Sequence, residues 1–194
     1  MKKISLSLLF LFFVSAIFAQ PIFELGIKGG INNSKITANI HDYNSESIVK
    51  SHIGAFARLG VGNVYVQPEV YFSSKGGELK SSVLETATQF DLNNVDVPVL
   101  LGVRIINGET ANVHLIAGPI FSFVTSTNIY GDTRFTEQYF RDHYFGYQYG
   151  FGVDLWKFFV DARIEHSTNY LYYHPDLLKS KNKSLMITVG FKIL

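Results

Sequence analysis

The stretch FGYQYGFGVDLW, residues 145–156, places an apolar or aromatic residue at every second position. Glycine, glutamine and aspartate fill most of the positions between them. A period of two indicates a β-strand with two unlike faces, because successive side chains point to opposite sides of a strand. This pattern suits both a soluble sheet with one buried face and a membrane barrel with one lipid-facing side. The rest of the chain must therefore decide between the two.

The same alternation recurs along the chain and predicts eight strands. They cover residues 23–32, 52–61, 64–75, 93–105, 113–125, 145–156, 159–168 and 185–194. The connections alternate strictly between long polar segments (33–51, 76–92, 126–143 and 169–184) and short turns (62–63, 107–112 and 156–157). In an up-and-down barrel this pattern collects the long loops at one end and the short turns with both termini at the other, as in outer-membrane barrels. We therefore predict an all-β fold, an eight-stranded antiparallel up-and-down transmembrane β-barrel.

The charged residues of these strands decide which face meets lipid. They share one face of each strand, and a basic side chain on the lipid face near the midplane costs roughly 2–4 kcal/mol. Most strand glycines fall on this polar face, and the aromatic residues on the other. We therefore expect the aromatic face to meet lipid, and because eight strands leave room for side chains rather than a channel, the lumen to be filled. The expected polar lumen network is Lys28, Arg58, Glu69, Asp96, Arg104, Asp154, Asp161, Arg163 and Glu165.

Three prolines interrupt this pattern, because proline cannot donate a hydrogen bond to a neighbouring strand. Pro68, Pro98 and Pro119 lie inside the third, fourth and fifth predicted strands. Each requires a bulge or a local break in the pairing, and the sequence does not place it.

Residues 1–19 predict a cleaved signal peptide, with Lys2 and Lys3 before an apolar run and a small-residue junction before Gln20. Residues 20–194 then form the barrel domain. The 17 basic and 16 acidic residues nearly balance, so we expect no nucleic-acid partner. Zero cysteines exclude disulfides, thiolate metal sites and a cysteine nucleophile. The six histidines lack the spacing of a metal site, so we expect neither a metal nor a cofactor.

Several segments resemble the outer-membrane β-barrel family of Bacteroidota that is often labelled PorT-like. The most specific are QPE at residues 67–69, followed by a lysine-glycine, and VDVP at residues 95–98; others include AGPIFSF and the terminal ITVGFKIL. The resemblance implies an eight-stranded barrel similar to the membrane domains of OmpA and OmpX, and implies little about activity. One departure is the terminal Leu194, where such barrels usually end on an aromatic residue.

We expect no enzymatic activity and a structural or interactive role in envelope integrity, adhesion or docking of a surface or secretion component. Expected partners are outer-membrane lipid, lipopolysaccharide (contacted by the basic run 179–183), the barrel-assembly machinery during insertion, and an unidentified extracellular or secretion-system protein. Aromatic residues and arginine are enriched at recognition hot spots. The long loop that carries them supplies the candidate interaction surface: Tyr130, Arg134, Phe135, Tyr139, Phe140 and Arg141.

Three alternatives remain open. A secreted lipocalin-like barrel would invert the faces and bind an apolar ligand inside. An outer-membrane lipid-modifying enzyme would depend on His166 or His143, although neighbours along one strand, such as Glu165, His166 and Ser167, point to opposite faces. A small pore would conduct steady currents.

Overall fold

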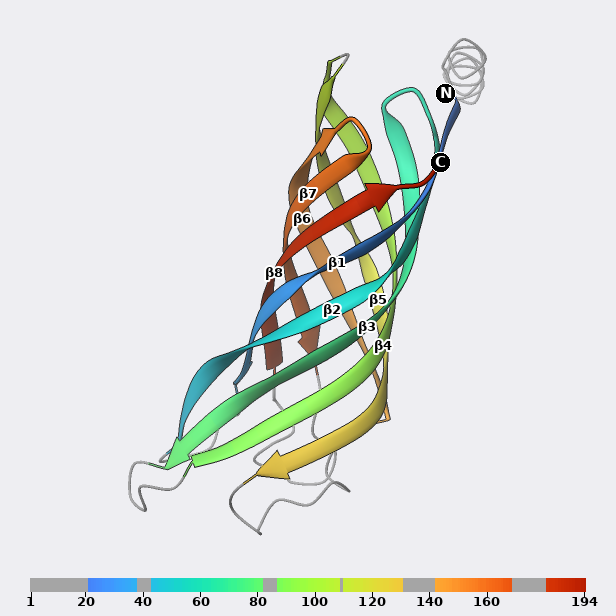
Figure 1. Ribbon diagram of the computed structural model, residues 1–194. Helices are drawn as coiled ribbons and strands as arrows, with labels where there is room; N and C mark the ends of the chain where they lie inside the picture. Colours follow the sequence, from blue (N-terminus) through green and yellow to red (C-terminus); the bar gives the residue numbers. More distant parts are fainter. Residues whose placement is uncertain (1–20, 38–42, 82–86, 109, 131–141, 169–180) are drawn as a thin grey trace, which may run out of the picture.

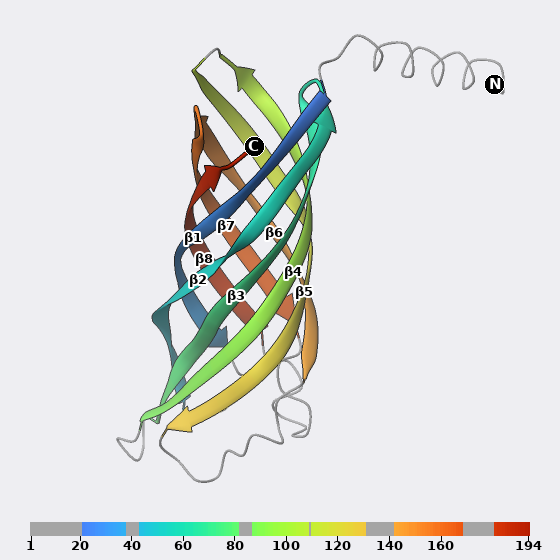
Figure 2. The ribbon, with the colours of Figure 1, turned by 45° about the vertical axis from the view of Figure 1, so that its right-hand side comes forward.

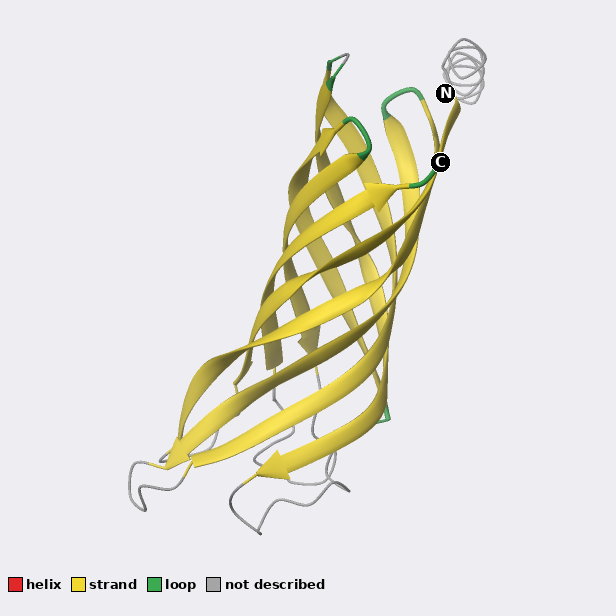
Figure 3. Ribbon diagram, viewed as in Figure 1, coloured by secondary structure: helices red, strands yellow, loops and turns green. Residues whose placement is uncertain are grey.

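The computed structural model describes residues 21–37, 43–81, 87–108, 110–130, 142–168 and 181–194. These residues form strands joined by short turns (Figure 3). No helix among them is long and apolar enough to cross a membrane. The strands are β1 (Pro21–Thr37), β2 (Tyr43–Val61), β3 (Val64–Ser81), β4 (Ala87–Asn107), β5 (Ala111–Tyr130), β6 (His143–Leu155), β7 (Phe158–Thr168) and β8 (Lys181–Lys192).

The eight strands close into one barrel in chain order, and β1 pairs with β8. Every neighbouring pair is antiparallel. Figures 1 and 2 show the strands wrapping obliquely around a common axis, which is the tilt that closure of a twisted sheet requires. The predicted fold class is therefore confirmed.

The two ends of the barrel differ. Turns at Gly62-Asn63 and Trp156-Lys157 lie at one end, called here the turn end, where β1 and β5 begin and β4 and β8 finish (Figure 1). The opposite end, where β1 finishes and β2 begins, is called the loop end. Gly62 has φ 63° and Trp156 has φ 53°. The predicted glycine at the first tight turn therefore meets a real need for a positive φ, whereas Trp156 adopts that angle despite its side chain.

Seven strands are longer at the loop end than their alternation predicted. β2 begins nine residues before the predicted start at residue 52. β1, β3, β4, β5, β6 and β8 also extend into segments predicted to be loop. At the turn end, β6 stops at Leu155 and β8 at Lys192, slightly short of the predicted bounds. The predicted strands stopped where apolar residues stopped alternating. Backbone pairing needs no apolar face, so the ladder continues beyond the part of the barrel that needs one.

The three prolines produce local breaks rather than bulges. Pairing between β2 and β3 skips two positions beside Pro68 and resumes in the same register. The same happens between β3 and β4 beside Pro98, and between β4 and β5 beside Pro119. Each proline therefore removes local hydrogen bonds without shifting the strands. The register shifts in these sheets lie elsewhere, at Glu46/His52, Asn93/Asn94 and Arg104/Ile106.

The two faces of the wall are sorted as the charge argument predicted. Phe151 on the outer face is 57% exposed, whereas Asp161 on the inner face is 0% exposed. Along β6, exposed or half-exposed residues alternate with buried or half-buried ones over its whole length. The lipocalin-like alternative required apolar residues inside and charges outside. The structure contradicts that alternative, because the charges are enclosed.

Candidate functional site

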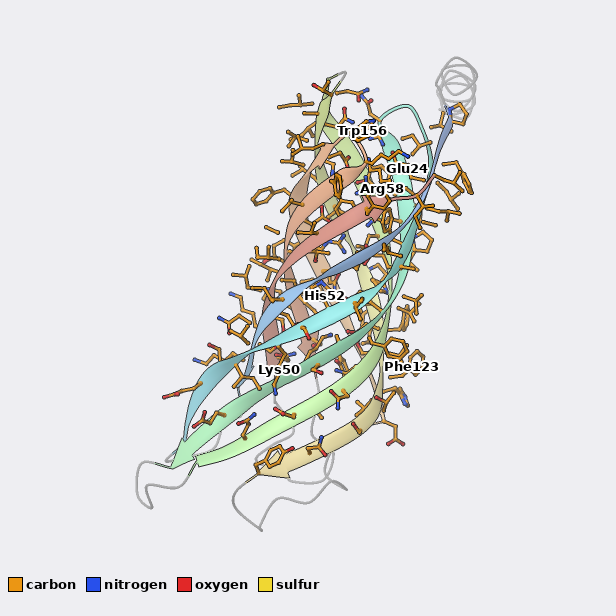
Figure 4. The ribbon with its side chains drawn as sticks, in the orientation of Figure 1. Glu24, Lys50, His52, Arg58, Phe123 and Trp156 are labelled. Atoms are coloured by element: carbon orange, nitrogen blue, oxygen red, sulfur yellow. The ribbon has the colours of Figure 1, made fainter. Side chains whose placement is uncertain are left out.

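The lumen is the site that the charged residues build. Eight of the nine predicted network residues are buried: Lys28, Arg58, Glu69, Asp96, Asp154, Asp161, Arg163 and Glu165. Arg104 lies closer to the surface, with its side chain 12% exposed. The sheet brings all nine to the inner face because each occupies the inward phase of a strand with period two. Figure 4 shows Glu24 and Arg58 near the turn end and His52 nearer the middle.

One group of ion pairs is centred on Arg163 of β7. Its guanidinium lies 2.9 Å from a Glu69 carboxylate oxygen on β3 and 2.5 Å from one of Asp161. Lys28 of β1 pairs with the same Glu69 carboxylate, which also accepts a hydrogen bond from Gln67. These side chains reach across the barrel between strands that are not neighbours, so they occupy its interior.

A second group surrounds Arg58 of β2. Its Nη1 lies 2.7 Å from Asp154 on β6 and 3.2 Å from Glu24 on β1. The guanidinium carbon also lies 4.9 Å from the ring centroid of Phe159 and 5.0 Å from that of Tyr65. Aromatic faces attract guanidinium groups, so these rings stabilise the cation while filling space beside it.

The third group is a single lysine between two carboxylates. Lys75 Nζ lies 2.6 Å from Glu165 on β7 and 2.8 Å from Asp96 on β4. All three side chains are 0% exposed. Ser73 donates to Asp96, and Gln148 donates to Glu165, so each carboxylate also accepts a hydrogen bond from a neutral side chain.

Charge in the described lumen is balanced. The ion-paired carboxylates are Glu24, Glu69, Asp96, Asp154, Asp161 and Glu165, and the paired bases other than histidine are Lys28, Arg58, Lys75, Arg104, Arg163 and Lys192. Six carboxylates are therefore matched by six basic side chains. A buried charge without a partner is strongly destabilising, so this matching explains how so many ions coexist inside a narrow barrel.

The predicted list of nine residues omitted four members of the network: Glu24, Lys75, Lys192 and His114. His114 is buried, with Nε2 3.0 Å from Asp161 and Nδ1 3.3 Å from Asp154, and so joins the Arg163 group to the Arg58 group. Spacing between histidines could not reveal it, because its partners come from β6 and β7. The sequence feature that could have identified His114 is its position in β5. It alternates in step with Ile116 and Ser122, whose side chains also lie on the inner face.

The lumen is also less polar than predicted. Buried apolar and aromatic residues form two clusters inside it: Ile22, Tyr65, Leu100 and Ile116, then Tyr71, Ile120 and Met186. The inward glycines provide the volume. A Cβ on Gly102 would overlap the Tyr65 ring, and one on Gly152 would overlap Asp161 and His114. Glycine thus admits large neutral groups as well as charged ones.

The histidines proposed for catalysis are not assembled into a relay. His166 lies on the outer face, stacked at 5.1 Å on Tyr147 and at 5.8 Å on Tyr149, whereas Ser167 is buried on the inner face. His143 is exposed at the first residue of β6. Within the described segments, no group of three His, Asp or Glu side chains could hold a metal ion.

The candidate loop surface falls mainly outside the described residues. Tyr130, the last residue of β5, is 58% exposed at the loop end. Arg134, Phe135, Tyr139, Phe140 and Arg141 lie in the segment 131–141, which the structure does not describe.

Comparisons with known proteins agree with this geometry. The family model for the outer membrane protein beta-barrel domain matches residues 18–173. No curated protein matched the chain. Among solved structures, the chain is similar to the outer membrane protein OprG from Pseudomonas aeruginosa, with 12% identity and a TM-score of 0.54, covering 90% of this chain and 97% of that one. It is also similar to Neisserial surface protein A (NspA), with 11% identity and a TM-score of 0.52, covering 87% and 97%.

At these identities the structural likeness shows the fold alone, and the family match carries the assignment. That match spans most of the chain, and the enclosed charges and exposed apolar wall are the features that a lipid-embedded barrel requires. The chain belongs to the outer membrane protein beta-barrel domain family and is an outer-membrane protein.

Proposed function

We propose that this barrel is a non-enzymatic and non-conducting protein with a structural or interactive role: envelope integrity, adhesion, or docking of a surface or secretion component. The observation that carries the proposal is the set of ion pairs that cross the lumen. Ion pairs join opposite sides of the wall, from Lys75 on β3 to Glu165 on β7 and from Arg58 on β2 to Asp154 on β6. With the interior occupied, the surfaces that remain for function are the outer wall and the loop end.

A row of basic residues on the outer wall supports contact with lipid phosphates. Lys35 of β1 is directly opposite Lys183 of β8, which is directly opposite His166 of β7. Lys35 and Lys183 are exposed, and His166 is half-exposed. Like charges directly opposite each other destabilise a sheet, and a bound anion relieves that repulsion. The phosphates of lipopolysaccharide are the anions expected at this end of an outer-membrane barrel.

Membership of the PorT-like group of Bacteroidota is part of the proposal. The QPE motif supplies Gln67 and Glu69 to the lumen while Pro68 faces outward, and the VDVP motif supplies Asp96, which pairs with Lys75. The motifs behind the resemblance are thus also network residues. The proposed signal peptide, residues 1–19, lies outside the described residues, and N-terminal sequencing of the outer-membrane protein is expected to begin at Gln20.

The first test measures the ion conductance of the barrel. Protein reconstituted in planar bilayers is expected to show no steady single-channel current, and a double variant, Lys75→Ala with Glu165→Ala, is expected to raise conductance by removing one crossing of the lumen. Steady currents from the wild-type protein would refute the blocked lumen and favour a small pore. The lipid-modifying alternative predicts a change in extracted lipids that disappears in His166→Ala or His143→Ala, and we expect no such change.

A second test separates a structural role from docking. Cells lacking the protein are expected to become more sensitive to bile salts or large apolar antibiotics if the barrel supports the envelope. A variant with residues 131–141 replaced by a short glycine-serine linker would then restore resistance. If the role is docking or adhesion, the same variant would reach the membrane, shift on heating in a gel, and fail to restore surface attachment. Normal resistance and normal attachment without the protein would contradict both roles.

A further inference from the structure

The wall of the barrel is interrupted between β2 and β3. Pairing runs from Val61↔Val64 as far as His52↔Ser73, and the next pair is Glu46↔Glu78. Five residues of β2 and four of β3 therefore face each other without pairing, and the register shifts across the gap. In Figure 1, β2 and β3 separate on this side of the barrel toward the loop end. Two side-chain contacts cross this region among the described residues. The Asn32 amide of β1 donates to the Ser74 carbonyl of β3 at 2.7 Å, and Lys50 Nζ of β2 lies 2.7 Å from an Asp91 carboxylate oxygen of β4.

A cavity of about 550 Å³ occupies this interruption. Its floor comes from inner-face residues of the wall, including His52, Ser73 and Asn94, and its mouth comes from the outer-face residues Ile53 and Phe72. Its volume lies in the range of roughly 300–1,000 Å³ usual for small-molecule sites. The cavity thus connects the polar interior with the lipid-facing side of the wall.

Two buried polar atoms on the floor have no hydrogen-bond partner among the described residues. They are His52 Nδ1 and Asn94 Oδ1, on side chains that are 3% and 1% exposed. The other ring nitrogen of His52 is engaged with Thr188, and the Asn94 amide donates to the Leu92 carbonyl. Buried polar groups are almost always hydrogen-bonded in native proteins, so these two atoms call for a hydrogen-bonding occupant.

The mouth of the cavity is apolar, whereas its floor is polar. Ile53 and Phe72 are directly opposite each other across the β2–β3 pair and are 68% and 66% exposed. They belong to the apolar outer face of the barrel. An occupant that satisfies both floor and mouth needs a polar head and an apolar tail.

We infer that this cavity binds the uncharged, hydroxyl-rich headgroup of a membrane amphiphile, such as the sugar of a glycolipid, entering from the lipid side. Every polar side chain lining the cavity is a serine, threonine, asparagine or histidine, and no charged side chain of the described residues lines it. Hydroxyl groups both donate and accept, so they suit Asn94 Oδ1 and either tautomer of His52. A phosphate headgroup would need a cation, which this lining lacks. The inference is independent of the blocked lumen.

The chain offers a variant that fills the cavity without disturbing the wall. A Cβ on Gly29, which lines the cavity from β1, would approach nothing closer than 3.5 Å, the ordinary contact with the His52 carbonyl. Gly29→Val therefore adds bulk to the site with a residue that suits a strand. Ala117→Val is the matched control, because Ala117 lines an apolar groove on another part of the outer wall.

The experiment titrates isotope-labelled protein in phospholipid bicelles with n-octyl-β-D-glucoside and follows the backbone amides of Ser51, Ser74 and Asn93 by NMR. We expect saturable shifts at these amides, weakened roughly tenfold or more by Gly29→Val and unchanged by Ala117→Val. Asn94→Ala is a second variant that removes one acceptor without filling the cavity, and it should weaken binding by several-fold. A heat-shift gel verifies that each variant is folded.

Three results would overturn the inference. The first is a set of equal, non-saturating shifts over the whole outer face, which indicates a general amphiphile coat only. The second is an equal response to n-octylphosphocholine, which indicates that the tail alone is recognised. The third is undiminished binding in both folded variants, which places the site elsewhere.

Discussion

Among the lumen residues, Lys75 is the one whose substitution should lower the free energy of unfolding most. Its ammonium group lies between the Glu165 and Asp96 carboxylates, and all three side chains are fully buried. Among the described residues, Lys75 is the base that forms an ion pair with Asp96, and it is also the base that forms an ion pair with Glu165. Lys75→Met keeps much of the side-chain volume while removing the charge, and so leaves two carboxylates inside the barrel without a cation.

The expected loss of stability in Lys75→Met follows from this arrangement. Removing one partner of a buried ion pair costs about 3–5 kcal/mol, because the other charge remains uncompensated. Here two charges are left, so we expect the upper end, about 5 kcal/mol. Glu165→Gln should be far milder, about 1 kcal/mol, because Lys75 keeps Asp96 as a partner. The double variant should recover about 2 kcal/mol relative to Lys75→Met, since it leaves one buried carboxylate instead of two.

The assay is equilibrium unfolding in urea of protein folded into phospholipid vesicles. The fluorescence of Trp156, the single tryptophan, reports on unfolding. Trp156 lies at the turn end and does not contact Lys75. The reasoning would be refuted if Lys75→Met lost less than about 1 kcal/mol, or if Glu165→Gln were as damaging as Lys75→Met. The first result would mean that water enters the lumen freely. The second would mean that packing, rather than charge balance, determines stability at this position.

Three further substitutions test the wall. Gly152→Val should prevent closure of the barrel, because its Cβ would overlap Asp161 and His114, and the heat-shifted band should disappear from the gel while Gly29→Val retains it. Phe151→Arg, on the outer face at the fifth residue from the turn end of β6, should destabilise by about 2–4 kcal/mol in urea unfolding, and an effect near zero would contradict the lipid-facing assignment. Trp156→Gly should stabilise by about 1 kcal/mol by relieving the positive φ, measured by circular dichroism, and a loss of stability would show that the exposed ring contributes more than the strain.

The pairing between β8 and β1 continues beyond the last residue of β8. Phe191 pairs with Phe158 of β7 and Ile27 of β1, and the two residues after β8 continue to bond to β1. The amide of Ile193 donates to the Leu25 carbonyl at 2.8 Å, and the amide of Leu25 donates to Leu194 at 3.2 Å. The pairing that joins β8 to β1 thus extends to Leu194.

The strand pattern was predictable because it follows from one local rule. Side chains alternate between the two faces of a strand, so the lipid-facing and lumen-facing sets could be separated without knowing which strands are neighbours. The strict alternation of long and short connections then predicted the closed up-and-down order. The same rule failed at the loop end of β2, where residues 43–51 pair or extend without an apolar face to mark them.

The contacts inside the lumen were not predictable in the same way. Inward phase placed Lys75 and Glu165 on the same side of the wall, but their pairing depends on the shear of a closed barrel, which sets the heights of β3 and β7 relative to each other. His114 was missed for this reason, since both of its carboxylates come from other strands. Likewise, no residue type marks the interruption between β2 and β3, because it arises from a mismatch of five residues against four across two strands.

Sequence alone therefore determined the architecture of this protein: strand number, the face of each residue within the alternating segments, and the end at which each connection lies. These are properties of the local chain, repeated eight times. Tertiary structure alone decided which charges meet, which rings fill the space beside glycine, and where the wall opens. Those outcomes depend on register and closure, which bring together residues far apart in the chain and which no local pattern encodes.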